Sequence, residues 1–202
     1  SLSTLKDQRG EFCAYKLDLG KAYDRLDWQF LKSMLGAFGF APTWINWIMT
    51  CVTSVRFLVR FNGQLLQPFY PSSGLRQWDP LSPYLFLFVA EALSLLLKDA
   101  CEKGALKEFH VNRQALGISH LLFADDSLLF FKGSIDEALI IKNILLTYEG
   151  GTGQLLSPDK CSIKFGKKSV VWKIRWPRWS FLILLQKVFR ISTLVYRYLR
   201  VE

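Results

Sequence analysis

Apolar residues recur along this chain with two different spacings, which predict strands in some segments and helices in others. Alternating or short unbroken apolar runs between turn residues predict strands at 13–19, 55–61, 64–69, 121–123, 128–131 and 161–165. Apolar residues three and four positions apart predict helices that start near residues 28, 42, 83 and 134. Because antiparallel hairpins and long helices follow one another in mixed order, the pattern predicts an α+β fold rather than a doubly wound parallel sheet.

Capping and turn residues set the predicted limits of these elements. Asp27 is expected to cap the first helix, and Ser82-Pro83 has the form of an N-cap followed by a first helical residue. Asn62-Gly63 is typical of the tight turn of a hairpin. Gly150-Gly151 is expected to end the fourth helix, since glycine disfavours a helix interior.

Two adjacent carboxylates interrupt an otherwise nearly continuous run of apolar residues, LLFADDSLLFF at residues 121–131. The flanking apolar runs predict two buried strands, so Asp125 and Asp126 are expected at the tip of the hairpin between them. Two anions side by side repel each other and resist desolvation, so they either share a proton or bind a divalent cation. The alternative is an ordinary solvated turn, in which Asp is common because its side chain bonds nearby backbone amides.

A third carboxylate, Asp18, is predicted at the carboxyl end of the first strand. If that strand is a neighbour of the central hairpin in one sheet, Asp18 converges with Asp125 and Asp126. Such a cluster suits two Mg²⁺ ions about 4 Å apart, which activate an attacking hydroxyl and stabilise the leaving oxygens of an in-line phosphoryl transfer. The sequence therefore predicts a polymerase-type site.

Length and composition bound the fold and the setting. The chain has 202 residues, half of them hydrophobic, which suffices for one domain with a hydrophobic core. The longest apolar stretch, 84–97, contains Glu91 and is too short to cross a bilayer, so no membrane partner is expected. The four cysteines and two histidines do not have the spacing of zinc ligands. The absence of a starting Met and of a leader predicts an excerpt of a longer reading frame and an intracellular setting.

The positive charge is concentrated at the end of the chain. The formal net charge is +9, of which residues 1–166 carry +1 and residues 167–202 carry +8. A basic stretch that also contains Trp172, Trp176 and Trp179 can bind a phosphate backbone and stack on bases. The alternative is a stretch that is under no structural selection.

Four blocks of the chain resemble, in the same order, blocks of the reverse transcriptases of non-LTR retrotransposons, most closely plant LINE-type elements. The blocks are KLDLGKAYDR at 16–25, GLRQWDPLSPYLF at 74–86, FADD at 123–126 and the segment 153–165. The resemblance covers about residues 11–166. It implies a polymerase palm-like antiparallel sheet packed on helices, with the fingers and thumb largely missing. It also implies RNA-directed DNA polymerase activity on an RNA or DNA template with a primer and deoxynucleoside triphosphates.

The resemblance implies a catalytic or metal-binding role for five residues. Asp18 and Asp125 are expected to bind both Mg²⁺ ions, for which Mn²⁺ is a substitute. Asp126 and the backbone carbonyl of Leu19 are expected to support them. Lys160 is expected to donate a proton to the departing pyrophosphate, and its alternative is a solvated turn lysine.

The resemblance also implies a nucleotide-binding role for three residues. The ring of Tyr23 is expected to block a ribose 2′-hydroxyl by steric exclusion, and its alternative is a core aromatic. Gln77 is expected to contact the incoming nucleotide, and Arg76 the template or the triphosphate. The alternative for both is an ordinary surface loop.

The chain departs from the family pattern at several positions. Trp78 stands where the family has glycine, and we expect it to lose the positive φ or close approach that glycine permits, and so to weaken nucleotide binding. Ser157 and Cys161 replace the usual Asn and Ser. From residue 167 the likeness ends, which predicts two parts: a partial palm-like domain at 1–166 and a divergent basic tail at 167–202, frameshifted or poorly ordered. The alternative function is a catalytically inactive retrotransposon relic that at most binds nucleic acid.

Overall fold

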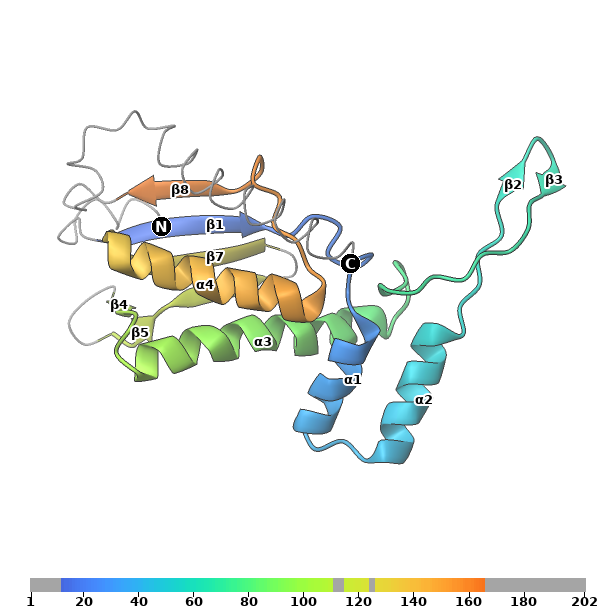
Figure 1. Cartoon of the computed structure of the whole chain (residues 1–202), viewed down its shortest axis with the longest axis horizontal. Helices are drawn as coiled ribbons and strands as arrows, with labels where there is room; N and C mark the ends of the chain where they lie inside the picture. The colour runs from blue at the N-terminus through green and yellow to red at the C-terminus, as the bar shows by residue number, and fades with distance from the viewer. Residues whose placement is uncertain (1–11, 111–114, 124–125, 166–202) are drawn as a thin grey trace, which may run out of the picture. The chain divides into compact units, whose positions relative to one another are not determined.

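The computed structural model describes residues 12–110, 115–123 and 126–165. The described residues form two compact units: the first takes those within 1–18, 97–143 and 156–202, and the second takes those within 19–96 and 144–155. The elements in chain order are β1 (Phe12–Asp18), α1 (Trp28–Ala37), α2 (Pro42–Thr53), β2 (Arg60–Phe61), β3 (Gln64–Leu65), α3 (Ser82–Glu102), β4 (Phe109–His110), β5 (Gly117–Ile118), β6 (His120–Phe123), β7 (Asp126–Lys132), α4 (Ile135–Thr152) and β8 (Ser162–Phe165) (Figure 1).

The first unit contains an antiparallel sheet of four strands in the order β6-β7-β1-β8. β1 is an interior strand, and its residues Cys13, Ala14, Tyr15 and Leu17 are buried. An apolar run suits a strand that is covered on both faces, which explains why β1 lacks strict alternation. The predicted α+β class and the antiparallel sheet are confirmed.

An aromatic cluster fills part of the core of the first unit. Phe109 stacks on Phe130 with ring centroids 5.4 Å apart, and its ring is edge-on to Phe12 at 5.5 Å. Phe109 belongs to β4, which pairs with β5. The hydrophobic pattern did not predict these two strands, because segments of two residues are too short to show a period.

The second unit begins with the turn after β1 and continues into α1 and α2. Asp27 caps α1 as predicted, since its carboxylate accepts a hydrogen bond of 2.7 Å from the backbone N–H of Phe30. α2 begins at Pro42, as the sequence also predicted. The indole N–H of Trp28 donates to the carbonyl of Gly74 at 2.6 Å and so ties α1 to the loop before α3.

The ends of α3 and α4 differ from the prediction. Ser82 is the first residue of α3 rather than its cap, and the carboxylate of Asp79 accepts from the N–H of Leu81 in the preceding turn. α4 runs through both glycines to Thr152. The Thr152 hydroxyl donates to the carbonyl of Tyr148, and the Thr152 carbonyl accepts from Asp27. The local bond within the last turn and the tertiary bond from Asp27 together outweigh the low helix propensity of glycine.

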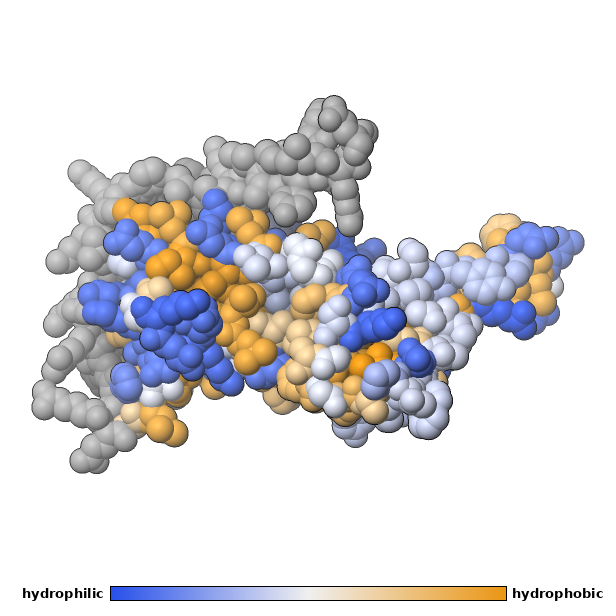
Figure 2. Space-filling view, turned by 60° about the horizontal axis from the view of Figure 1, so that its bottom comes forward, coloured by the Kyte–Doolittle hydropathy of each residue, from blue (hydrophilic) through white to orange (hydrophobic). Residues whose placement is uncertain are grey.

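The hairpin between α2 and α3 has the predicted turn but much shorter strands. Only two residue pairs form its ladder, with a further isolated bridge between Phe57 and Phe69. Its apolar side chains are exposed, and Figure 2 shows hydrophobic and hydrophilic residues intermixed at its end. Two strands without a third neighbour or a covering helix bury little surface, which explains the short ladder.

Within the described residues, no helix combines the length and the apolar character that are needed to cross a membrane.

Candidate functional site

Asp18 and Asp126 lie opposite each other at the end of the β1–β7 ladder. The register pairs these two residues directly, so both side chains leave the same face of the sheet. The Asp126 side chain is 56% exposed and that of Asp18 is 26% exposed. Like charges directly opposite each other destabilise an antiparallel pair, so this strand end favours a cation between or beside the carboxylates. The prediction that the first strand neighbours the central hairpin is confirmed.

A lysine accompanies each of these carboxylates. Lys16 Nζ lies 2.9 Å from Asp126 Oδ1, and Lys160 Nζ lies 3.7 Å from Asp18 Oδ1. The sequence prediction named Lys160 but missed Lys16. The signal was present, because Lys16 is two residues before Asp18 and therefore lies on the same face of the strand.

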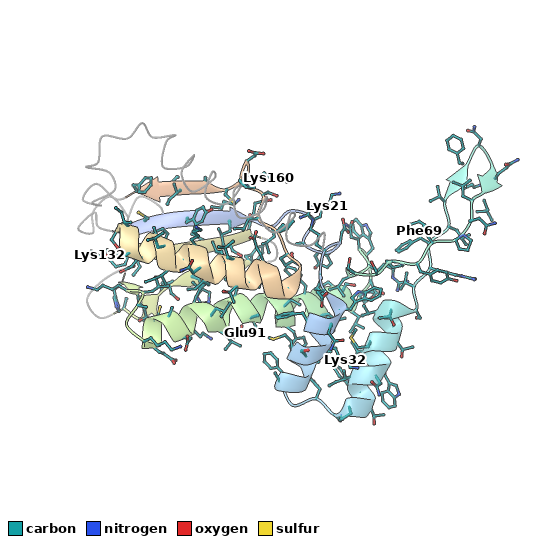
Figure 3. All side chains as sticks on the ribbon, in the orientation of Figure 1. Lys21, Lys32, Phe69, Glu91, Lys132 and Lys160 are labelled. Carbon is teal, nitrogen blue, oxygen red and sulfur yellow. The ribbon has the colours of Figure 1, made fainter. Side chains whose placement is uncertain are left out.

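The turn before β8 brings Lys160 to this strand end. The backbone N–H of Ser157 donates to the carbonyl of Asp18 at 2.8 Å, and the N–H of Lys160 donates to the carbonyl of Ser157 at 2.9 Å. Figure 3 shows Lys160 in the turn that leads into β8. Because the backbone of Ser157 makes the contact, the replacement of the family's Asn by Ser does not remove it.

The donor chemistry of this strand end fits a divalent cation. Carboxylate oxygens are the ligands that Mg²⁺ and Mn²⁺ prefer. In the described part of the chain, no group of three or more His, Cys, Asp or Glu side chains is arranged to hold a metal ion. Asp125, the third predicted carboxylate, lies outside the described residues.

The second unit contains the remaining predicted site residues. Leu19 follows Asp18 directly and is buried. Tyr23 is half-buried, and its ring stacks on Phe86 with centroids 5.1 Å apart and an angle of 14° between the planes. The Tyr23 carbonyl accepts from the N–H of Leu75 at 2.6 Å. One face of the Tyr23 ring is therefore fixed against α3.

Gln77 and Arg76 lie on an exposed loop and have partners within the second unit. The Gln77 amide donates to Asp24 at 3.3 Å. The Arg76 guanidinium donates to the carboxylate of Asp79 through Nε at 3.0 Å and also through a second nitrogen. The hydrogen bond from Arg76 lowers the pKa of Asp79 below its usual range. Both loop residues are held in place beside the Tyr23 turn.

The backbone of Trp78 contradicts one prediction from the sequence, the loss of a positive φ at this position. Its backbone has φ = 65°, so the tryptophan retains the positive φ that was expected to require glycine. Its side chain is 100% exposed and fills no space in the loop. The left-handed conformation costs a non-glycine residue about 1–2 kcal/mol, which the loop carries as strain.

Replacing Trp78 with Gly is expected to stabilise the chain by about 0.5–1 kcal/mol. The variant relieves the backbone strain, and the greater flexibility of glycine in the unfolded state offsets part of the gain. Urea unfolding measures this difference. Ser72→Gly, at an exposed position without positive φ, is the matched control and is expected to destabilise. Equal destabilisation by both variants would contradict the strain at Trp78.

The family described as "Reverse transcriptase (RNA-dependent DNA polymerase)" matches residues 2–177 of this chain. The chain belongs to the reverse transcriptase family. Its relatives include the retrovirus-related Pol polyprotein of the type-1 retrotransposable element R2 of Popillia japonica, which is 31% identical over 149 residues. An uncharacterized mitochondrial protein of Arabidopsis thaliana is 54% identical over 57 residues. The predicted assignment to the reverse transcriptases is confirmed, and proteins of retrotransposable elements are among the relatives that the chain resembles.

Solved structures agree with the reverse transcriptase fold. The chain is similar to the apo telomerase of Candida tropicalis truncated from its C-terminal domain, with a TM-score of 0.59 and 18% identity over 84% of this chain and 34% of that one. At this identity the likeness shows the fold alone. The match to the Popillia polyprotein spans 72% of this chain and 23% of that protein. The match to the Arabidopsis protein spans 28% of this chain and 47% of that protein. The chain therefore spans less than half the length of each of these two relatives.

Proposed function

We propose that the chain is the palm of an RNA-directed DNA polymerase that extends a primer on an RNA or DNA template with deoxynucleoside triphosphates. The observation that carries the proposal is the pairing of Asp18 with Asp126 at the end of β1, with Lys160 beside Asp18. Family membership and the non-LTR retrotransposon relatives support the same activity.

Asp18, Asp125 and Asp126, with the backbone carbonyl of Leu19, are the groups that we propose to hold two Mg²⁺ ions. When bound, such ions lower the pKa of the attacking hydroxyl and stabilise the charge on the leaving oxygens. The carboxylates supply hard oxygen ligands. Asp18 is the less exposed of the two described carboxylates, and we therefore assign it the larger part of the metal affinity.

Lys160 is the group that we propose to protonate the departing pyrophosphate. Its side chain is 70% exposed, and the turn that carries it is anchored to the Asp18 carbonyl. A solvated ammonium on an anchored turn has a proton to give and freedom to reach the leaving group. Lys16 would remain with Asp126 and hold that carboxylate in place.

We propose that Tyr23, Arg76 and Gln77 bind the nucleotide. The Tyr23 ring rests on Phe86, so it resists displacement by a ribose 2′-hydroxyl. Gln77 has an amide to offer the nucleotide in exchange for Asp24. Arg76 has a guanidinium to offer the triphosphate or the template, in exchange for Asp79.

We also infer that the chain derives from a plant LINE-type element and that its palm-like domain ends near residue 166. The identity of 54% with the Arabidopsis protein over 57 residues supports the origin. The proposed palm-like domain is 1–166 and the proposed divergent tail is 167–202, a division that rests on the charge of the tail. The tail lies outside the described residues.

Primer extension on the purified chain with Mg²⁺ or Mn²⁺ tests the proposed activity, with Asp125→Asn as the control. Incorporation that Asp125→Asn abolishes is the expected result. If wild type and Trp78→Gly both fail to incorporate any nucleotide, the alternative of an inactive relic holds for this polypeptide. The large exposed ring of Trp78 on the proposed nucleotide loop is the observation that favours that alternative.

A further inference from the structure

Gln154 is a fully buried polar residue that contacts the turn carrying Tyr23. Its relative exposure is 0%, and its side-chain amide donates a hydrogen bond of 2.8 Å to the carbonyl of Ala22. Ala22 directly precedes Tyr23, and it is itself buried. The peptide bond that Gln154 holds is therefore the one that joins Ala22 to Tyr23.

The backbone around Gln154 brackets the same turn on both sides. Gly20 donates to the carbonyl of Leu155 at 2.8 Å, and Asp27 donates to the carbonyl of Thr152 at 2.8 Å. Gly153 has φ = 75°, and a Cβ there would lie 2.5 Å from the carbonyl oxygen of Arg25. The segment 152–155 thus lies directly against the turn of residues 20–27, the turn that carries Lys21 in Figure 3.

The Oε1 atom of the same amide shows that filling a buried space does not explain why a glutamine stands at position 154. In the described part of the chain, Gln154 Oε1 is buried and has no hydrogen-bond partner. A buried acceptor without a partner lowers stability, and an apolar side chain of the same length would fill the space without that cost. The glutamine is therefore explained by its donor, which reaches Ala22.

We propose that Gln154 is a positioning residue that fixes the Tyr23 ring and thereby sets the discrimination between deoxynucleotides and ribonucleotides. This inference rests on the proposed role of Tyr23. Tyr23 is held at three points. Phe86 supports the face of its ring, the N–H of Leu75 donates to its backbone carbonyl, and the Gln154 amide donates to the backbone carbonyl of Ala22 before it. Loss of the third point lets the ring move away from a 2′-hydroxyl, since a steric block works only when it is rigid.

The variant that tests the proposal is Gln154→Met, which keeps the length of the side chain and removes its donor. Hydrogen exchange of the turn peptide, residues 19–27, and the ratio of kcat/KM for dCTP to that for CTP, two nucleotides that differ only at the 2′ position, are measured on the full chain. Loss of one hydrogen bond is expected to speed exchange in the turn about fivefold and to lower the ratio about fivefold. Ile45→Val, a buried change in α2, is the control and leaves both unchanged.

Tyr23→Ala separates this inference from the proposed function. If Tyr23→Ala lowers the ratio and Gln154→Met leaves the ratio at the wild-type value, the role of Gln154 is overturned. A general loss of folded protein does not produce the expected result, because it lowers both kcat/KM values equally. If Tyr23→Ala leaves the ratio unchanged, or no variant incorporates nucleotide, the proposed role of Tyr23 fails. The inferred discrimination by Gln154 then fails with it. Hydrogen exchange still tests whether Gln154 holds the turn, and unchanged protection of residues 19–27 in Gln154→Met would overturn that contact.

Discussion

Replacing Asp18 with Asn is expected to lower nucleotide incorporation at least about 1000-fold in a primer-extension assay. The variant keeps the size of the side chain but loses the charge that we propose to hold the cations, a contribution of several kcal/mol to the transition state. It also removes one of two opposed carboxylates, so it is not expected to destabilise the sheet. Unfolding in urea checks that the fold is retained.

Asp126→Asn is a second test of the proposed metal site, and Asp136→Asn is its control. The Asp126 side chain is more exposed than that of Asp18 and is paired with Lys16, so we expect a smaller loss, on the order of tenfold. Asp136 is an exposed acid in the first turn of α4, and its replacement is expected to leave incorporation unchanged. Equal rates for wild type and Asp18→Asn would remove Asp18 from the proposed mechanism.

Replacing Gly74 with Ala is expected to destabilise the second unit by about 2–5 kcal/mol. The residue has φ = 89°, and a Cβ would lie 2.6 Å from the carbonyl oxygen of Asp24. The cost therefore combines a backbone that alanine disfavours with a collision against another backbone. The Gly74 N–H also donates to the carbonyl of Leu26, so the loop cannot move away without loss of a hydrogen bond. Urea unfolding measures the change.

Gly39→Ala is the matched control for this prediction. Gly39 has φ = 82°, but a Cβ there would meet nothing within 4 Å. Only the conformational cost of about 1–2 kcal/mol applies to it. If both variants lower the free energy of unfolding by the same amount, the loop at Gly74 does not lie as close to the Asp24 backbone as the structure places it.

The sequence predicted the sheet and the strand end because each depends on local signals. The apolar runs on either side of Asp125-Asp126 predicted the hairpin, and the polar residue at the end of the first strand predicted Asp18 at its tip. The register pairs Asp18 with Asp126 as these two predictions require, but β7 begins at Asp126, so this residue lies in the strand and not in the predicted turn. The cap at Asp27 was also predicted correctly, since a cap is formed within a single turn.

The errors occur where distant contacts override local preference. α4 continues through Gly150-Gly151 because Thr152 bonds to Asp27, more than a hundred positions away in the chain. Trp78 accepts a positive φ because the loop imposes it. Gln154 was not singled out, since its donor acts on Ala22 and nothing in its own segment marks that contact. Pairings across the chain are not encoded in the periodicity of either partner.

Titration with Mn²⁺, followed by the electron paramagnetic resonance of the free ion, tests the central claim most directly. The claim is that the carboxylates at the end of the β1–β7 ladder bind the cations. Wild type is expected to bind Mn²⁺, Asp18→Asn to bind it at least about tenfold more weakly, and Asp136→Asn to bind it like wild type. Equal Mn²⁺ binding by wild type and Asp18→Asn would contradict the account, because the cations would then bind elsewhere on the chain.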